Sequence, residues 1–180
     1  MLMQLAAATT NLDAARGVLK KVAGIAYADL RGRSNLPFQA LVTASSDRLA
    51  PLEEIADVGF YLVCRRVIKP GAPGVVGLFP MIAHPERGPD ASDAHWRDVH
   101  APLALEHHPH MTAYDQLCVV HRFSGLDVNG FALCGFANED DLRNRFYVSE
   151  EGVRIIAEDV ARFADLKRSP NRLIATPLTA

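Results

Sequence analysis

Residues 75–83 read VVGLFPMIA, and residues 131–137 read FALCGFA. Both stretches have the composition of buried strands, with apolar residues at odd and even positions alike. A strand of a sheet that is solvated on one face alternates apolar with polar residues. The second face of these strands must therefore be buried too, most simply against another sheet in a closed barrel. A single three-layer domain with helices on both faces is the alternative.

The elements around these strands follow the same order twice. The second half predicts a strand, a helix, two strands, a helix and a strand, at residues 75–83, from 92 or 93 onward, 111–123, 128–137, 138–166 with an interruption near 147–152, and 172–178. The first half allows the same order, at residues 1–9, from 11 or 13 to 26, 27–31 as a poor strand, 38–44, from 51 onward and 60–68.

The linker KPGAPG at residues 69–74 separates the two halves. We therefore predict an α+β fold, a ferredoxin-like α+β barrel made of two fused βαββαβ units with antiparallel sheets. Residues 1–70 form a degenerate N-terminal ferredoxin-like half in this prediction, and residues 74–180 form the second half. Pro80 within its strand predicts an edge position or a bulge, because proline has no N–H to donate.

Composition argues against several classes of function. The formal net charge is −2 without a basic stripe, which argues against a nucleic-acid partner. No apolar run approaches the ~18 residues of a membrane span, and the N-terminus has no basic leader, so we expect a cytoplasmic protein without a membrane partner. Three cysteines in apolar runs indicate free thiols in a reducing compartment. The chain also has no phosphate-binding glycine loop and no nucleophile elbow, so we expect no cofactor.

All seven histidines lie between His84 and His121, and five of them fall within residues 95–114, HWRDVHAPLALEHHPHMTAY. Histidine titrates near neutral pH, which makes this segment the first place to look for chemistry. Pro102 lies inside the expected helix and should kink it or begin a second segment. Trp96, Val99, His100 and Leu103 share one face of such a helix.

The second half resembles the EthD-like family of the dimeric α+β barrel superfamily. The resemblance covers roughly residues 75–178 and rests on WRDVHAPL at 96–103, Tyr114, and EDVARFAD at 158–165. In the family, a tryptophan, a histidine and a small-proline-leucine run occupy the first helix, and an aspartate and a phenylalanine four apart occupy the second. The family is functionally mixed, and neighbouring families include cofactor-free monooxygenases and isomerases, so the fold predicts no single reaction.

His100 is the first candidate catalytic residue, as a general acid or base at the mouth of a barrel cavity. Asp159 is the candidate that orients His100, since a carboxylate partner fixes the tautomer of an imidazole. Both residues also have structural interpretations: His100 as a satisfied core histidine, and Asp159 as the partner of Arg154 or Arg162. Tyr114 is the third candidate, through the family match, as a hydroxyl that positions the substrate.

Further residues are candidates for the wall of a substrate pocket, although core packing is an alternative for the apolar ones. These candidates are Trp96, Phe79, Met81, Phe131 and His121. Tyr114 and His121 differ in parity along one strand, so they should face opposite sides. His107, His108 and His110 invite a metal interpretation, but Pro109 separates them and no cysteine lies near. We expect no metal site and a solvated helix end instead.

These residues predict a cofactor-independent enzyme that acts on a small apolar or aromatic molecule by acid–base chemistry. Isomerisation, decarboxylation, dehydration or a monooxygenase-type reaction of a substrate carbanion would suit these groups. The alternatives are a binding or accessory protein for a hydrophobic metabolite, and an architectural barrel without a ligand. Whether two chains form a homodimer stays open, because exposed sheet edges or helix faces can pair.

Overall fold

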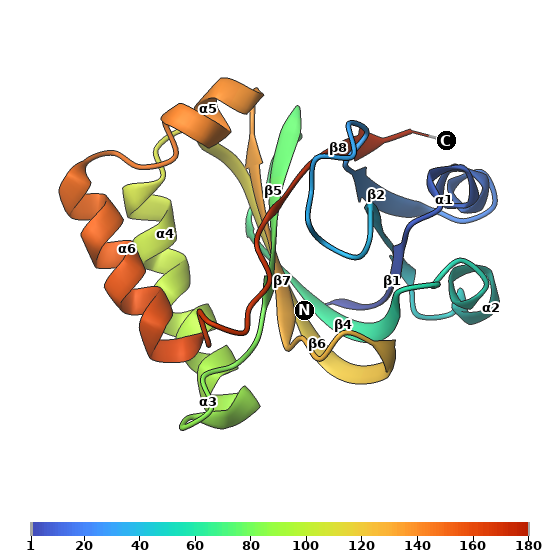
Figure 1. Ribbon diagram of the computed structural model, residues 1–180, viewed down its shortest axis with the longest axis horizontal. Coiled ribbons are helices and arrows are strands. Elements are labelled where there is room, and N and C mark those ends of the chain that lie inside the picture. Colours follow the sequence, from blue (N-terminus) through green and yellow to red (C-terminus); the bar gives the residue numbers. More distant parts are fainter. Residues whose placement is uncertain (1, 180) are drawn as a thin grey trace.

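The computed structural model describes residues 2–179, and its strands close into one barrel (Figure 1). The first half contributes β1 (Leu2–Thr9), β2 (Gly24–Ala28), β3 (Ala40–Ser45) and β4 (Gly59–Lys69). The second half contributes β5 (Val75–Met81), β6 (Met111–Gly125), β7 (Gly130–Phe136) and β8 (Leu173–Leu178). Around the barrel the order is β1-β3-β2-β8-β5-β7-β6-β4, and every pairing is antiparallel.

Each half has the βαββαβ order and the same sheet arrangement. The strands lie in the order β4-β1-β3-β2 in the first half and β8-β5-β7-β6 in the second. The two sheets meet where β2 pairs with β8 and where β4 pairs with β6. The predicted α+β barrel of two fused ferredoxin-like units is confirmed, and the three-layer alternative is wrong. The assignment of residues 1–70 and 74–180 to separate domains stays a prediction.

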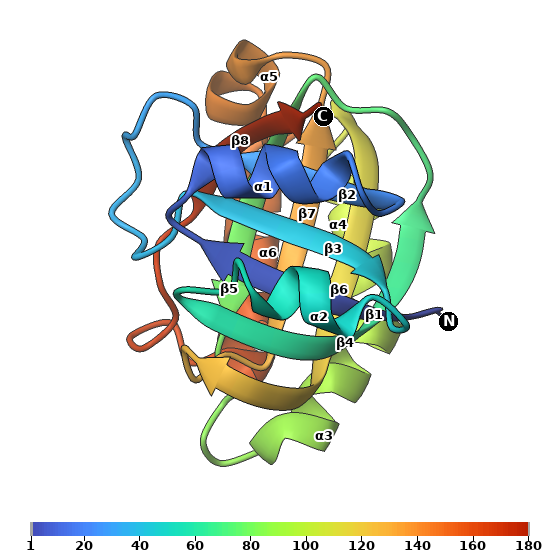
Figure 2. The same cartoon turned by 90° about the vertical axis from the view of Figure 1, so that its right-hand side faces the viewer.

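Helices cover the outside of the barrel on two opposite sides (Figure 1). In the first half, α1 (Leu12–Leu19) and α2 (Leu49–Glu53) lie over the sheet (Figure 2). In the second half the helical elements are α3 (Gly88–His95), the π-helical turn η1 (Trp96–His100), α4 (Ala101–His107), α5 (Glu139–Asn144) and α6 (Glu150–Phe163). The side chains of Asn11, Asn138 and Ser149 cap α1, α5 and α6 by accepting backbone N–H groups.

The strands of the second half are buried on both faces, as their sequences predict. Val76 and Leu78 of β5 point into the barrel, where they pack with side chains from both halves. Val75 and Met81 of the same strand lie on the opposite face, beneath the helices of the second half. Pro80 pairs with Phe131 of β7, beyond the residues Val76–Leu78 that pair with β8. Its missing N–H therefore breaks no ladder on that side.

Two expected helix boundaries are wrong. The first helix ends at Leu19 rather than at residue 26, and Ile25 and Ala26 belong to β2. Gly24 permits this strand, because a Cβ at this position would lie 2.6 Å from the backbone oxygen of Thr43. The histidine-rich helix begins at Gly88 rather than at Ser92 or Asp93, with Pro89 in its first turn.

Two further expectations concern the whole chain. Cys64, Cys118 and Cys134 are free thiols, as predicted. None of the helices within residues 2–179 has the length and apolar character needed to cross a membrane.

Candidate functional site

The helix that carries His95, Trp96 and His100 widens into one π-helical turn before α4 begins. The backbone N–H of Ala101 bonds to the carbonyl of Trp96, five residues earlier. Pro102 has no N–H for the carbonyl of Asp98, four residues before it, so the regular ladder is interrupted here. The expected break at Pro102 is confirmed, and its form is this wide turn.

The π turn changes which residues of this helix are buried. Trp96, His100, Ala104 and His108 are buried at intervals of four, so they form one stripe along the helix. Val99 was expected on this face, but its side chain is 43% exposed. The extra residue in the turn rotates Val99 outward and brings His95 and His100, five apart, to the same partner.

That partner is Asp159 on α6, whose side chain is 2% exposed. One carboxylate oxygen lies 2.9 Å from Nδ1 of His100, and the other lies 2.7 Å from Nε2 of His95. Burial alone would raise the pKa of Asp159, but hydrogen bonds from His100 and His95 outweigh it and lower that pKa below its usual value. Asp159 is thus an anion that accepts a hydrogen bond from each ring.

Both imidazoles are fixed in one tautomer by this arrangement. An ionised carboxylate only accepts hydrogen bonds, so Nδ1 of His100 carries the proton. In the neutral form of this ring Nε2 has a free lone pair, and Nε2 has no hydrogen-bond partner among residues 2–179. Nδ1 of His95 lies 3.4 Å from Nη1 of Arg87. A guanidinium only donates hydrogen bonds, which agrees with a His95 ring whose proton is on Nε2.

Tyr114 on β6 lies beneath the same helix and is fully buried. Its hydroxyl oxygen accepts hydrogen bonds from Nε1 of Trp96 at 3.0 Å and from Nε2 of Gln116 at 3.1 Å. Gln116 also donates to the backbone oxygen of Trp96 at 3.0 Å, which fixes its amide orientation. Two donors therefore point at the phenol oxygen, and its own proton remains available. Burial raises the pKa of Tyr114, which keeps that proton in place.

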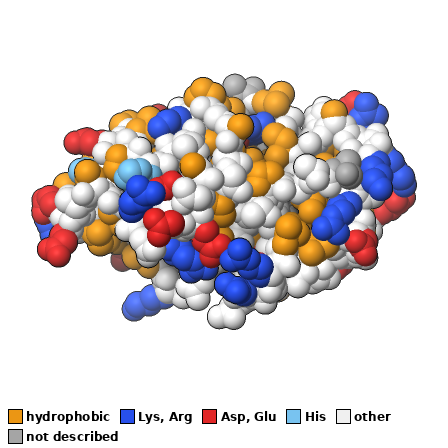
Figure 3. Space-filling view, turned by 90° about the horizontal axis from the view of Figure 1, so that it is seen from above, with side chains coloured by type: hydrophobic (Ala, Val, Ile, Leu, Met, Phe, Trp, Pro, Cys, Tyr) orange, Lys and Arg blue, Asp and Glu red, His pale blue; other side chains and the backbone are white. Residues whose placement is uncertain are grey.

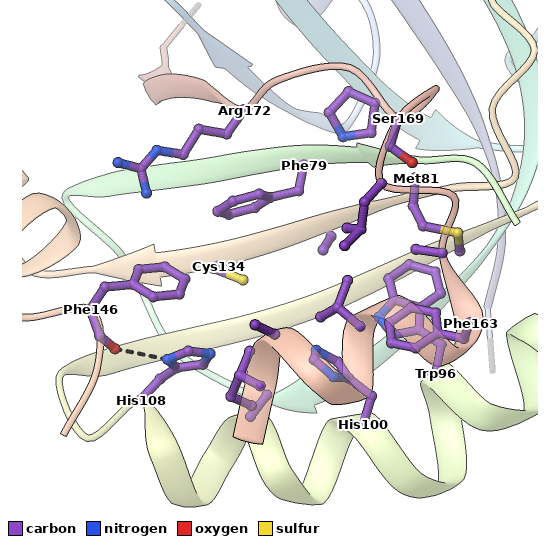
Figure 4. Close-up of a pocket in the computed structure, with 18 of the residues that line it drawn as sticks. Phe79, Met81, Trp96, His100, His108, Cys134, Phe146, Phe163, Ser169 and Arg172 are labelled. Carbon is purple, nitrogen blue, oxygen red and sulfur yellow. Dashed lines mark hydrogen bonds between the residues drawn. The ribbon is translucent and has the colours of Figure 1, made fainter. Parts of the chain in front are cut away.

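A cavity of about 680 Å³ lies between the helices of the second half and the outer face of its sheet (Figure 4). This volume is within the usual range for small-molecule sites. Its wall is mostly apolar and contains Phe79, Met81, Trp96, His100, Ala104, His108, Tyr114, Ala132, Cys134, Phe146, Tyr147, Ile156, Val160, Phe163 and Arg172. His100 lies near Trp96 and Phe163 at one end of the cavity, and Arg172 lies at the other end (Figure 4).

Phe163 packs against the rings that carry the polar groups. Its ring centroid lies 5.0 Å from that of His100, 5.5 Å from that of His95 and 6.5 Å from that of Trp96. Phe163 follows Asp159 by one turn of α6, so the same helix supplies both the carboxylate and the apolar contact.

His108 lies on the cavity wall and differs from the expectation of a solvated helix end. Its side chain is buried, and Nδ1 donates to the backbone oxygen of Phe146 at 2.8 Å (Figure 4). Burial, together with nearby His100 and His107, lowers its pKa to about 4, although the hydrogen bond to Phe146 opposes this shift. His108 is therefore neutral at pH 7. Within residues 2–179 no three or more His, Cys, Asp or Glu side chains are grouped so that they can hold a metal ion.

The structure brings together His100, Asp159, Tyr114, Trp96, Phe79 and Met81 around one cavity. Phe131 lies elsewhere, on the barrel side of β7, where it packs edge-on against Phe38 and Tyr61. His121 is exposed and packs against Phe123. A bulge at Val120 reverses the parity after Val119, so His121 pairs with Leu62 and does not share the barrel-facing side of Leu117.

The cavity is not at the barrel mouth, where we expected His100 to act. The barrel interior is packed with apolar side chains from both halves, whereas His100 faces the space between helices and sheet. Sequence reasoning also missed His95, Gln116, His108 and Arg172. The histidines lay in the noted cluster, but no pattern in the sequence distinguished Gln116 or Arg172.

Comparisons with known proteins agree with this fold. Residues 84–167 match the family model of the EthD domain, which confirms the resemblance for the second half. No curated protein matches the sequence. Three solved structures each align with 98% of this chain. They are an anthrone oxidase-like protein (11% identity, 90% of that chain, TM-score 0.57), a proposed monooxygenase from Lactobacillus acidophilus NCFM (10%, 92%, 0.53) and a mutant chlorite dismutase from Candidatus Nitrospira defluvii (10%, 90%, 0.52). At these identities the likeness shows a shared fold.

Proposed function

We propose that this protein, whose residues 84–167 match the EthD domain, is a cofactor-independent enzyme that moves a proton on a small apolar or aromatic organic molecule. The observation that carries the proposal is the buried His100–Asp159 pair on the wall of the cavity. Asp159 holds the imidazole in the tautomer whose Nε2 lone pair is free to accept a proton. A carbonyl compound with acidic protons on the neighbouring carbon is the substrate type that fits this base.

Tyr114 supplies the second group that such chemistry requires. Removal of a proton beside a carbonyl places negative charge on the carbonyl oxygen, and a fixed hydrogen-bond donor stabilises that charge. The phenol proton of Tyr114 is free for this role, because Trp96 and Gln116 both donate to its oxygen. The proton then returns from His100 to another atom of the substrate in an isomerisation, or the carbanion reacts further.

The apolar wall supports the choice of substrate class. Phe79, Met81 and Phe163 give the cavity flat and flexible apolar surfaces, which suit an aromatic body. Exclusion of water by such a wall strengthens the hydrogen bonds to a developing oxyanion. A carbanion formed here is also of the type that reacts with molecular oxygen, so a monooxygenase-type outcome remains within this proposal.

The experiment is hydrogen–deuterium exchange of 2-tetralone in D2O, followed by proton NMR. We expect the wild-type protein to accelerate exchange at the carbon beside the carbonyl, and His100→Gln to reduce that acceleration by about 100-fold or more. Equal affinity of both proteins for 2-tetralone, measured by calorimetry, would assign the loss to proton transfer. His121→Gln is the matched control, because His121 is exposed and lies outside the cavity.

Two results would contradict the proposal. Unchanged exchange in His100→Gln would exclude this histidine as the proton carrier. Binding of 2-tetralone by the wild type without any acceleration would favour the alternative, a binding or accessory protein for a hydrophobic metabolite in which His100 is structural.

A further inference from the structure

Arg172 lines the cavity at the end far from His100 (Figure 4). It is half-buried, and it forms no ion pair and no side-chain hydrogen bond with any residue between 2 and 179. Most other arginines of the second half are paired, for example Arg143 with Glu139 and Arg154 with Glu151 and Glu158. A guanidinium carries five N–H donors in a planar fork that matches an oxyanion. The donors of Arg172 are thus unused at the cavity wall.

The surroundings of Arg172 are positively charged. It also lines a second hollow of about 370 Å³, which contains Arg31, Arg33 and Arg143 as well. Two carboxylates line that hollow, and both are occupied. Glu139 pairs with Arg31 and Arg143, each at 2.7 Å, and Asp29 accepts the backbone N–H groups of Arg31, Arg33 and Ser34. Four guanidinium groups therefore face two carboxylates, which attracts an anion to this end of the cavity.

This charge lies on the side of the molecule where α5 packs against β5 and β7. Figure 3 views the molecule from the end at which α5 appears in Figure 1, and it shows basic and acidic side chains next to one another in the middle of that face. The positive charge of Arg172 also acts inside the cavity, because it opposes the effect of burial on the pKa of the Cys134 thiol.

We propose that the ligand of the cavity carries an anionic group, and that Arg172 binds this group while the apolar body extends toward His100. The substrate class is therefore an amphipathic anion: an aromatic or aliphatic body with a carboxylate or a phosphate ester at the far end. This inference rests on the proposed function for the place of the reacting carbon, but the binding of the anion does not depend on catalysis.

The charges at the two ends of the cavity explain why the anionic group of the ligand should bind at the Arg172 end. The Asp159 carboxylate, hydrogen-bonded to His95 and His100, lies behind the His100 end of the cavity. The opposite end has Arg172, which forms no ion pair within residues 2–179, and a neutral His108. An amphipathic anion bound in the reverse orientation would place its charged group near the Asp159 carboxylate. The two ends of the cavity therefore favour one orientation of the ligand.

The test compares three probes in calorimetric titrations: 4-phenylbutanoate, its neutral amide 4-phenylbutanamide, and 4-phenylbutyl phosphate. We expect the wild type to bind either anion about tenfold or more tightly than the amide, because hydrogen bonds to a charged group are the stronger ones. Arg172→Gln should remove this preference and leave the affinity for the amide unchanged. Unchanged amide affinity also shows that the variant is folded.

The controls separate this proposal from the one above. Arg168→Gln removes an exposed arginine that pairs with Asp127 and does not line the cavity, so this variant should keep the preference for anions. His100→Gln should also keep it, whatever its effect on exchange. Equal binding of acid and amide by the wild type, no binding of any probe at millimolar concentration, or an unchanged preference in Arg172→Gln would overturn the proposal. A preference for the phosphate over the carboxylate would identify the phosphate ester as the source of the anion.

Discussion

The carboxylate of Asp159 accepts a hydrogen bond from Nδ1 of His100 across 2.9 Å, although 59 residues separate the two in the chain. The same carboxylate bonds to His95, so one acid fixes two rings of the neighbouring helix. This relationship gives His100 a defined tautomer and a free Nε2 at the cavity wall. It also makes Asp159 the residue whose replacement has the most specific consequences.

Asp159→Asn replaces one of two accepting oxygens with an amide group that only donates. One of the two histidines must then change its tautomer or lose its hydrogen bond. We expect exchange of 2-tetralone to fall by about 100-fold and the free energy of unfolding to fall by about 1–3 kcal/mol. Denaturant titrations and the NMR exchange assay measure the two effects separately. An Asn variant that keeps full exchange activity would contradict the role of Asp159.

The lowered pKa of Asp159 should also make the free energy of unfolding depend on pH. Hydrogen bonds from the two histidines lower its pKa in the folded protein. The carboxylate therefore stabilises the fold above the unfolded value of ~3.9, and this contribution is lost as pH falls through the lower folded value. The Asn variant should lack this acidic loss of stability. If the free energy of unfolding depends on pH in the same way for the wild type and Asp159→Asn below pH ~4, the carboxylate does not contribute to the acidic loss of stability.

Tyr114→Phe removes the hydroxyl that receives hydrogen bonds from Trp96 and Gln116. We expect exchange to slow by about 100-fold, because the carbanion loses its donor. Stability should fall as well, by about 1–3 kcal/mol, because two buried donors lose their acceptor. The fluorescence of Trp96, the single tryptophan of the chain, should change with the loss of its partner. Full exchange activity in the Phe variant would remove Tyr114 from the mechanism.

The lowered pKa of His108 should cause a loss of stability at higher pH than the loss expected from Asp159. Its folded pKa of about 4 lies below the unfolded value of ~6.5, so the fold favours the neutral ring. The stabilisation is fully present above pH ~6.5 and falls by about 1.4 kcal/mol per pH unit as the pH drops toward 4, to a total of about 3 kcal/mol. Urea titrations across this range measure it.

His108→Asn is the informative variant, because its amide can still donate to the carbonyl of Phe146. Its stability should change less between pH 6.5 and 4 than that of the wild type. If both proteins show the same slope over this range, the acidic loss of stability comes from another group.

The position of the cavity is tested by two neighbouring residues on opposite faces of β7. Ala132 lines the cavity, whereas Phe131 points into the barrel. Ala132→Phe should fill part of the cavity and weaken the binding of 4-phenylbutanamide by at least tenfold. Phe131→Leu should lower the free energy of unfolding by about 1–2 kcal/mol and leave that affinity unchanged. The opposite assignment of effects would place the ligand inside the barrel.

The sequence predicts the fold well because the fold depends on patterns that composition makes visible. The two-sided strands VVGLFPMIA and FALCGFA require burial on both faces, and the barrel provides it. The linker and the order of elements then indicate two units. Boundaries were less predictable, because the apolar spacing of α1 continues through Ile25, whereas the chain already pairs with β3 from Gly24 onward.

The candidate site was predicted in part, for a similar reason. His100, Asp159 and Tyr114 stand in positions that the family resemblance marks, and the structure places them around one cavity. His95 was missed because residues five apart are about 140° apart on a regular α-helix. The π turn that aligns it with His100 has no sequence pattern beyond Pro102. The bulge that turns His121 away is likewise a matter of strand pairing between β4 and β6.

The most direct test of the account is an NMR measurement of the ring nitrogens of His100 in ¹⁵N-labelled protein, assigned by comparison with His100→Gln. It is made at pH ~8, where an ordinary imidazole is neutral. We predict a protonated Nδ1 and an unprotonated Nε2 whose chemical shift changes when 4-phenylbutanamide is added. A proton on Nε2, or an Nε2 signal that does not respond to a probe shown by calorimetry to bind, would contradict it.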